Sequence, residues 1–408
     1  MKKFLLLDKP QMGSDSAINL MVHGQGVFIF KYNEINVNEI NVDDVVSSNK
    51  CIIYFYNTDN SEGLRVEFAH GSVKVNTVSD GNILIDKKNK KGLSGLKGAY
   101  YWFSIDSQNQ QLYAGIGEAR LDNIIYKYKF AKKHKKFLED IVELQIGSES
   151  KSFLKPLRLL RDPITKIIPL VIKDVDELTM NDIANSSFMP KANLSVTAQK
   201  LYHCISGKNF ILDDADFPDF SKAIEYSIAT PKMWCNKTLK KKSTEFNKDK
   251  PNLLETYLRI TLGENNGESP GIPYVMEIWP VGHYSPIHNH SEANAIIRVL
   301  HGEINVSLYP FLCAKKDGIT PFAVADFKKD DVTWISPTLN QTHKLLNKKT
   351  SADTCITIQC YMYDIEDSGH YDYFDYLDEG GNILQYDPDS DMDFISFKNK
   401  MKEEWNAR

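Results

Sequence analysis

The sequence lacks the features that mark secreted, membrane-spanning and nucleic-acid-binding proteins. Nowhere do eighteen uncharged apolar residues follow one another, and the apolar run at residues 4–7 is too short for a signal peptide. The six cysteines are scattered over 408 residues and form no CxxC pair, which argues against a disulfide framework and a cysteine zinc site. Lys and Arg (49) nearly balance Asp and Glu (54), so no extended basic surface is expected. We expect a cytoplasmic protein that binds neither nucleic acid nor membranes.

Strand periodicity is abundant, and it falls into two blocks. Residues 20–130 alternate apolar and polar positions between short turn segments, which predicts about seven antiparallel strands in a small β-sandwich. Within this block, AYYWFSIDSQNQQLYAGIGEARLDNIIYKYKF resembles the farnesoic-acid-methyltransferase type of domain, a β-sandwich without a cofactor-binding methyltransferase motif. We expect a sandwich over residues 1–130 that binds a ligand or partner. The sequence does not identify that ligand or the number of chains that associate.

Three further segments complete the expected organisation. Residues 131–195 read as a connector, and the lysine-rich start of this segment is interpreted as a solvated helix face. A helical preface and a second block of strands follow over residues 196–365. The acidic tail, 366–408, contains aspartates that mimic the start of a calcium loop, but the loop glycine and the final glutamate are missing. Its last helix is expected to dock on the barrel through an apolar stripe that includes Phe397 and Met401.

The second block contains a histidine pair that suggests a metal site. His288 and His290 stand two residues apart on a predicted strand, and a period of two points both imidazoles to one face. His343 follows on a later strand, and three neutral imidazoles inside a barrel form a facial site with open positions, which suits Fe(II). Two polar histidines on an exposed strand are the alternative. Glu292 could add a carboxylate ligand by the same alternation, which would make a different metal site.

The spacing of these histidines resembles the cupin superfamily. His288, His290 and a closing Gly302 match its first motif, and His343 with Asn347 matches the second. The glutamate usual after the second histidine is absent, and a three-histidine cupin resembles the cysteine dioxygenase (thiol dioxygenase) family. This resemblance covers residues 195–365. It implies a double-stranded β-helix barrel that uses Fe(II) and O2 to oxidise a small thiol, such as L-cysteine or 3-mercaptopropionate, to its sulfinic acid.

The resemblance also implies roles for five residues around the metal. Arg259, in a Tyr-x-Arg context with Tyr257, stands where the family binds the substrate carboxylate, for which a guanidinium fork is well suited. Trp279 is expected to wall the pocket. Tyr361 stands where the family has a tyrosine that donates a hydrogen bond to bound oxygen or sulfur. Gln359 replaces a histidine of the family, and an amide cannot shuttle protons near neutral pH.

A second departure from the family, a neighbouring cysteine and two alternative functions complete the expectations. Ala295 takes the place of the cysteine that crosslinks to the tyrosine in animal members, so that thioether cannot form. Cys360 adjoins Tyr361, but strand alternation turns it to the other face and predicts a buried, inert thiol. The barrel could instead be a metal cupin for a non-thiol substrate, or a non-catalytic binding or structural module. The fold class is mainly β in every case: a sandwich, then a cupin barrel with a helical preface and a C-terminal helix.

Overall fold

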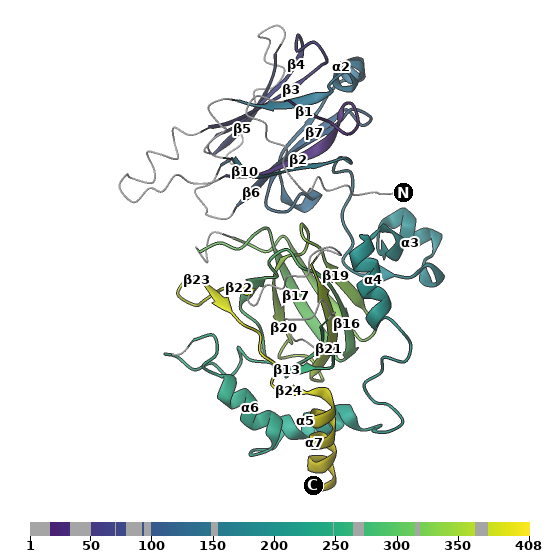
Figure 1. Ribbon diagram of the computed structural model, residues 1–408, viewed down its shortest axis with the longest axis vertical. Coiled ribbons are helices and arrows are strands. Elements are labelled where there is room, and N and C mark those ends of the chain that lie inside the picture. Colours follow the sequence, from purple (N-terminus) through teal and green to yellow (C-terminus); the bar gives the residue numbers. More distant parts are fainter. Residues whose placement is uncertain are drawn as a thin grey trace. The chain divides into compact units, whose positions relative to one another are not determined.

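The computed structural model describes residues 17–32, 50–69, 71–78, 92–93, 99–147, 154–247, 249–263, 273–314, 319–363 and 374–408. The chain divides into two compact units, Met1–Ile167 and Ile168–Arg408, and each is built mainly of strands (Figure 1). Among the described residues, no helix combines the length and the hydropathy that crossing a bilayer requires.

The first unit is a β-sandwich of two five-stranded antiparallel sheets (Figure 1). One sheet contains, in spatial order, β1 (Ile18–Asn19), β9 (Glu143–Ile146), β3 (Lys50–Tyr56), β4 (Gly63–Ala69) and β5 (Ser72–Thr77). The other contains β10 (Leu154–Leu160), β2 (Gln25–Tyr32), β6 (Tyr100–Asp106), β7 (Gln111–Ile116) and β8 (Ile124–Lys129). The predicted sandwich is confirmed.

Aromatic rings from facing strands fill the interior of the sandwich. The rings of Phe30 and Phe68 lie 5.1 Å apart, and each comes from a different sheet. The sandwich extends beyond residue 130, because β9 and β10 pair with its sheets and Leu144 is fully buried. A short helix, α2 (Lys135–Glu139), lies between β8 and β9. The first part of the segment expected as a connector therefore belongs to the sandwich.

Strands β6 and β7 approach closely where a glycine faces a tryptophan. Gly115 pairs with Trp102, and a Cβ atom at Gly115 would lie 2.1 Å from the indole ring. Real Cβ atoms do not come this close to other heavy atoms. The fully buried Trp102 can occupy its place because residue 115 has no side chain.

The second unit is a barrel of two six-stranded sheets. The first barrel sheet contains, in order, β19 (Val332–Ile335), β16 (Asn294–His301), β21 (Cys355–Met362), β14 (Tyr274–Trp279), β13 (Leu258–Thr261) and β24 (Met392–Asp393). The second barrel sheet contains β18 (Ala323–Lys328), β17 (Glu303–Tyr309), β20 (Thr342–Leu346), β15 (Ile287–Asn289), β22 (Phe374–Leu377) and β23 (Ile383–Tyr386). From β14 to β21 the chain passes repeatedly from one sheet to the other, which is the double-stranded β-helix that the resemblance to the cupin superfamily implied.

Helices cover the outer face of the first barrel sheet (Figure 1). They are α4 (Val196–Ile205), α5 (Phe220–Ala229), α6 (Trp234–Lys242) and α7 (Phe394–Asn406). A period of two along β13 and β14 turns Leu258 and Ile278 outward to these helices, and Arg259 and Glu277 therefore face the barrel interior. The predicted stripe on the last helix is confirmed, because Phe397 and Met401 belong to this helix-covered core.

The segments on both sides of the expected cupin region also belong to the barrel. Ile172 and Leu194 are buried against the outer face of the first barrel sheet. The short elements in this region are β11 (Ile172–Lys173), β12 (Met189–Pro190) and α3 (Met180–Asn185). At the other end, β22 and β23 join the second barrel sheet and β24 pairs in parallel with β13. The acidic tail therefore contributes three strands to the barrel in addition to its helix.

Candidate metal centre

A cavity of about 80 Å³ lies between the two barrel sheets. One water molecule needs about 10–15 Å³ on this scale, so the cavity has room for a ligand of a few heavy atoms. Aromatic and aliphatic side chains form most of its wall, together with His288, His290 and His343. The cavity is therefore suited to a small molecule that packs mainly against apolar side chains.

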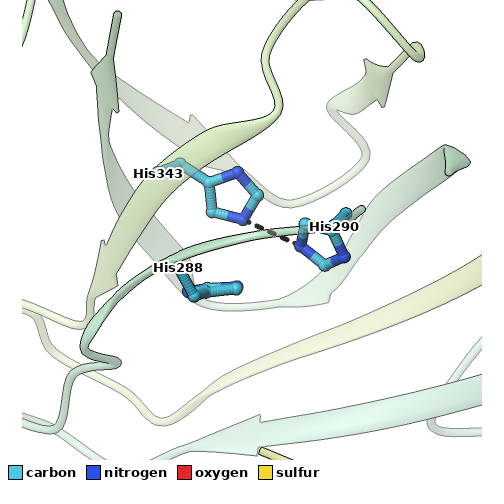
Figure 2. Close-up of side chains that lie close together, drawn as sticks. All are labelled: His288, His290 and His343. Carbon is cyan, nitrogen blue, oxygen red and sulfur yellow. Dashed lines mark hydrogen bonds between the residues drawn. The ribbon is translucent and has the colours of Figure 1, made fainter. Parts of the chain in front are cut away.

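Strand pairing brings the three predicted histidines together (Figure 2). His288 on β15 is the direct partner of His343 on β20, and His290 follows just after the end of β15. The nearest ring nitrogens of the three residues all lie within 4.8 Å of one another. The two Nε2 atoms of His290 and His343 are 3.2 Å apart.

Backbone carbonyl groups fix the tautomers of two of these histidines. The Nδ1 atom of His288 lies 3.2 Å from the oxygen of Pro286, and that of His343 lies 3.2 Å from the oxygen of Asn340. Because a carbonyl oxygen can only accept, Nδ1 must carry the proton in each neutral ring, and the lone pair is left on Nε2. This is the arrangement that orients histidine ligands in metal sites.

Burial keeps the cluster neutral. It lowers the pKa of His288 to about 4 and that of His343 to about 3, and in His343 the nearby His288 adds to the effect. Burial also places the pKa of His290 well below its ordinary value. Neutral imidazoles with free lone pairs are the form that binds a metal ion, so the residues present fit a three-histidine site.

Glu292 does not join this cluster. The alternation that would carry it inward ends with β15 at Asn289, and Ser291 and Glu292 then adopt left-handed backbone conformations with φ of 48° and 68°. The side chain of Glu292 is exposed, and its backbone N–H donates to Gln341. The alternative in which Glu292 completes the ligand set is therefore wrong.

The remaining aromatic candidates and Gln359 line the cavity. The ring of Tyr361 stacks on His290 at 5.5 Å, and that of Tyr257 stacks on Trp279 at 4.2 Å. Burial raises the pKa of both tyrosines well above 10, so each phenol keeps its proton at neutral pH. The Nε1 atom of Trp279 is buried and has no hydrogen-bond partner among the described residues, and the buried amide of Gln359 lies beside the carboxylate of Glu277, to which it donates. The indole N–H of Trp279 can donate a hydrogen bond to a bound ligand.

Arg259 is buried in a different setting from the expected one. Its guanidinium donates to Glu277 on the neighbouring strand at 3.1 Å, and both residues are more than nine-tenths buried. Glu277 lines the cavity, whereas Arg259 is not among the lining residues. Burial raises the pKa of Glu277, and the Arg259 charge offsets part of this effect. A carboxylate of the protein thus takes the position that was expected for a substrate carboxylate.

Sequence reasoning missed Glu277 and the aromatic residues of the tail. Glu277 could have been found, because alternation along YVMEIW places it on the same face as Trp279. Phe374, whose ring lies 4.5 Å from that of His290, and Tyr386 come from β22 and β23 and also line the cavity. No local signal distinguished these residues from other aromatic residues of an acidic segment.

Two smaller expectations concern the tyrosine strand. Ala295 is the cross-strand partner of Tyr361, so the position opposite the phenol carries a methyl group and no thiol. Cys360 is fully buried on the outer face of the same strand, among the residues that pack against α4. Burial raises the pKa of its thiol, in agreement with an inert cysteine.

The tail aspartates have structural partners. Asp393 accepts a hydrogen bond from the backbone of Ser396 and begins α7, as a helix cap does. Asp391 accepts from the backbone N–H of Arg259 at 2.8 Å and from Lys242 at 3.1 Å. These contacts hold the tail on β13 and α6, and they leave the calcium-loop interpretation without support.

Comparison with known proteins adds little to this geometry. No family model matches the sequence. A Schizosaccharomyces pombe cupin domain is 14% identical with a TM-score of 0.21, over 26% of this chain and 65% of that one. A cupin superfamily protein from Desulfitobacterium hafniense is 12% identical with a TM-score of 0.20, over 27% and 79%. An L-ribose isomerase from Cellulomonas parahominis is 14% identical with a TM-score of 0.21, over 28% and 61%. This chain thus spans less than two thirds of the first and third of these structures, and the fold assignment rests on the sheet topology described above.

Proposed function

We propose that the barrel is an Fe(II)-dependent thiol dioxygenase that converts a small thiol, with L-cysteine as the first candidate, to its sulfinic acid. Both oxygen atoms of O2 are added to the sulfur, so that RSH and O2 give RSO2H. The observation that carries the proposal is the cluster of His288, His290 and His343, which among the described residues includes no carboxylate. When bound, Fe(II) would supply the redox chemistry that joins O2 to sulfur.

The residues around the cluster support this chemistry in distinct ways. Tyr361 and Tyr257 keep their phenolic protons at neutral pH and can donate hydrogen bonds to ligand atoms. Trp279 contributes a buried indole N–H that has no partner among the described residues, and Gln359 contributes an amide beside Glu277. Phe374 packs against His290 and limits the access of water. The small volume of the cavity favours a thiol with few heavy atoms.

The experiment that tests the proposal combines metal analysis with oxygen uptake. The full chain is purified without oxygen, its metals are measured by mass spectrometry, and O2 consumption is followed with Fe(II) and a small thiol. We expect stoichiometric iron and a sulfinic acid product. His288→Ala and His343→Ala should lose both the iron and the product.

A matched control is His283→Gln. His283 is a buried histidine of the same barrel whose Nδ1 atom contacts Thr256, and it does not line the cavity. This variant should keep the iron. Iron without oxidation of any small thiol would redirect the search to a metal-dependent reaction on a non-thiol substrate. A barrel that takes up no metal would favour a binding or structural module.

A further inference from the structure

The described part of the cavity wall carries one acidic side chain and no lysine or arginine. Of the described residues that line the cavity, only Glu277 is an aspartate, glutamate, lysine or arginine. The remaining titratable groups on the wall are tyrosines, whose protons are retained at neutral pH, and the three histidines of the cluster. A ligand therefore meets a carboxylate as the one ionic group of the wall.

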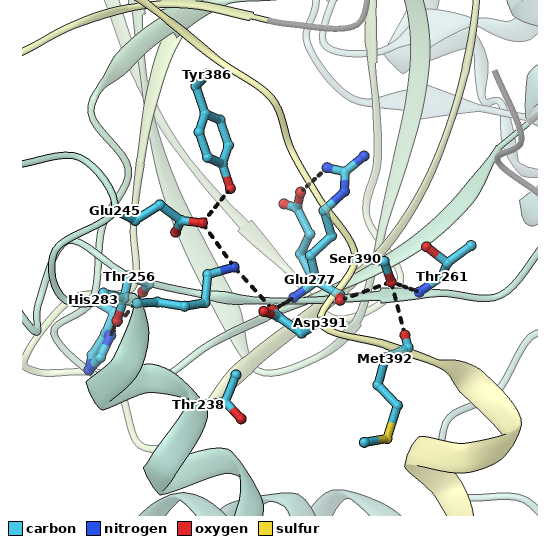
Figure 3. A network of polar contacts seen from close by, with 12 residues as sticks. Thr238, Glu245, Thr256, Thr261, Glu277, His283, Tyr386, Ser390, Asp391 and Met392 are labelled. Carbon is cyan, nitrogen blue, oxygen red and sulfur yellow. Dashed lines mark hydrogen bonds and ion pairs between the residues drawn. The ribbon is translucent and has the colours of Figure 1, made fainter.

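The guanidinium of Arg259 lies beside this carboxylate and is not among the groups that line the cavity. Arg259 on β13 is the cross-strand partner of Glu277 on β14, and its Nη1 atom lies 3.1 Å from Oε1 of Glu277. Its backbone is held from the other side by Asp391, which also contacts Lys242 (Figure 3). Arg259 is thus fixed by protein groups at both its main chain and its side chain.

Only one of these two charged groups can contact a ligand. Glu277 lines the cavity and Arg259 does not, so a ligand group on this part of the wall meets the carboxylate and not the guanidinium. A cationic group is attracted there, whereas a ligand carboxylate meets like charge and finds no cation on the wall.

Thr357 provides a second acceptor at the same place. It is the direct partner of Glu277 across β14 and β21, and its buried hydroxyl oxygen has no hydrogen-bond partner in the part of the chain that the structure describes. Thr357 is 1% exposed and lines the cavity. An ammonium group has three donors and no acceptor, so a carboxylate beside a free hydroxyl oxygen matches its hydrogen-bonding needs.

The nearby polar network reinforces this preference. Glu245 accepts a hydrogen bond from Tyr386, which lines the cavity, and lies 3.5 Å from Lys242 (Figure 3). Together with Asp391 and the Arg259–Glu277 pair, the network contains three carboxylates and two cations. It therefore has no surplus cation to offer an anionic ligand.

We infer that the substrate is a small thiol bearing an ammonium group, and that Glu277 with Thr357 binds this group and discriminates against thiols that carry only a carboxylate. This inference rests on the proposed thiol oxidation for its substrate class. It differs from the expectation of a carboxylate clamp, because Arg259 is already paired within the protein.

Three thiols of similar size test the inference on the iron-loaded full chain. They are cysteamine (ammonium only), L-cysteine (both groups) and 3-mercaptopropionate (carboxylate only). We expect kcat/KM to fall in this order, with about 10–100-fold between the first and the last, as one charged hydrogen-bonded contact provides. Glu277→Gln should remove most of this ratio, and Glu277→Asp should keep its direction. The exposed Glu292, as Glu292→Gln, serves as the matched control and should leave the ratio unchanged.

A binding measurement separates this inference from the proposed reaction. Ethylammonium and acetate are titrated into the metal-free full chain by calorimetry, with circular dichroism to confirm that each variant is folded. Binding of ethylammonium that Glu277→Gln abolishes would support the charge selectivity even if no thiol consumed oxygen, and then only the reaction would be refuted. A preference for 3-mercaptopropionate, or a ratio unaltered in folded Glu277→Gln, would overturn the inference.

Discussion

Replacing Arg259 by methionine should destabilise the barrel by about 3–5 kcal/mol, because it leaves Glu277 as a buried charge without a partner. The two side chains are 4% and 8% exposed and 3.1 Å apart. At an effective dielectric constant of about 20, the attraction over this distance is about 5 kcal/mol. Methionine retains most of the apolar volume of the arginine stem, so the loss reports the charge and not a cavity.

The double variant Arg259→Met/Glu277→Leu provides the decisive comparison. It removes both charges, so its cost should be well below the sum of the two single changes. Urea denaturation followed by tryptophan fluorescence measures each free energy of unfolding, since four of the five tryptophans lie in the barrel unit. The pair between Lys348 and Asp326, 38% and 55% exposed, is the surface control, and Lys348→Met should cost less than about 1 kcal/mol.

Two results would refute this reasoning. Arg259→Met could cost no more than Lys348→Met, in which case Glu277 would carry no charge that needs compensation. The double variant could also cost as much as the two single changes together, in which case the two side chains would not be energetically coupled.

Three other changes test separate parts of the structure. Gly115→Ala should destabilise the sandwich by more than about 2 kcal/mol through its collision with Trp102, as the near-ultraviolet circular dichroism of that unit will report. Asn347→Ala should cost about 2 kcal/mol in urea denaturation, because its buried amide donates to two backbone carbonyls at 2.8 and 3.0 Å. Burial raises the pKa of Glu245, so the folded carboxyl keeps its proton to higher pH than the unfolded one. The stability that this group contributes is therefore lost as the pH rises above its ordinary pKa of 4.5. In thermal denaturation, the Tm of Glu245→Gln relative to that of the unmodified protein should increase above this pH and stay constant below it.

Strand alternation predicted the strands and the shared face of His288 and His290, and the resemblance to the cupin superfamily implied the barrel. The period of two identifies strands, and the short HNH segment with a later histidine places three imidazoles on strands that a closed barrel must bring together. His288 and His343 are indeed direct partners across β15 and β20. Such predictions succeed because they need only the alternation of side chains along each strand and one order of strands in the barrel.

The partner of Arg259 could not be predicted in the same way. Whether a guanidinium faces a ligand or a protein carboxylate depends on strand register, and only the pairing of β13 with β14 places Glu277 opposite Arg259. The failure over Glu292 had a different cause. Alternation holds only within a strand, and two residues in left-handed conformations end it immediately after His290.

The tail was underestimated because its strands are short and lie in an acidic segment. β22 and β23 have four residues each, and β23 is largely exposed, so no apolar run announces them. They are specified by pairing with β15 and with each other, which is information that lies in the folded barrel.

The pairing of β24 with β13 makes the order of synthesis relevant to the barrel. Arg259 and Asp391 exchange hydrogen bonds of 2.8 Å in both directions although 132 residues separate them. During translation, β13 therefore leaves the ribosome long before the segment that covers its edge. Until residue 391 has emerged, this strand presents unpaired backbone groups of the kind that recruit other strands. A nascent chain halted before that point is expected to need a chaperone, whereas the sandwich, whose strands end at Leu160, can already be complete.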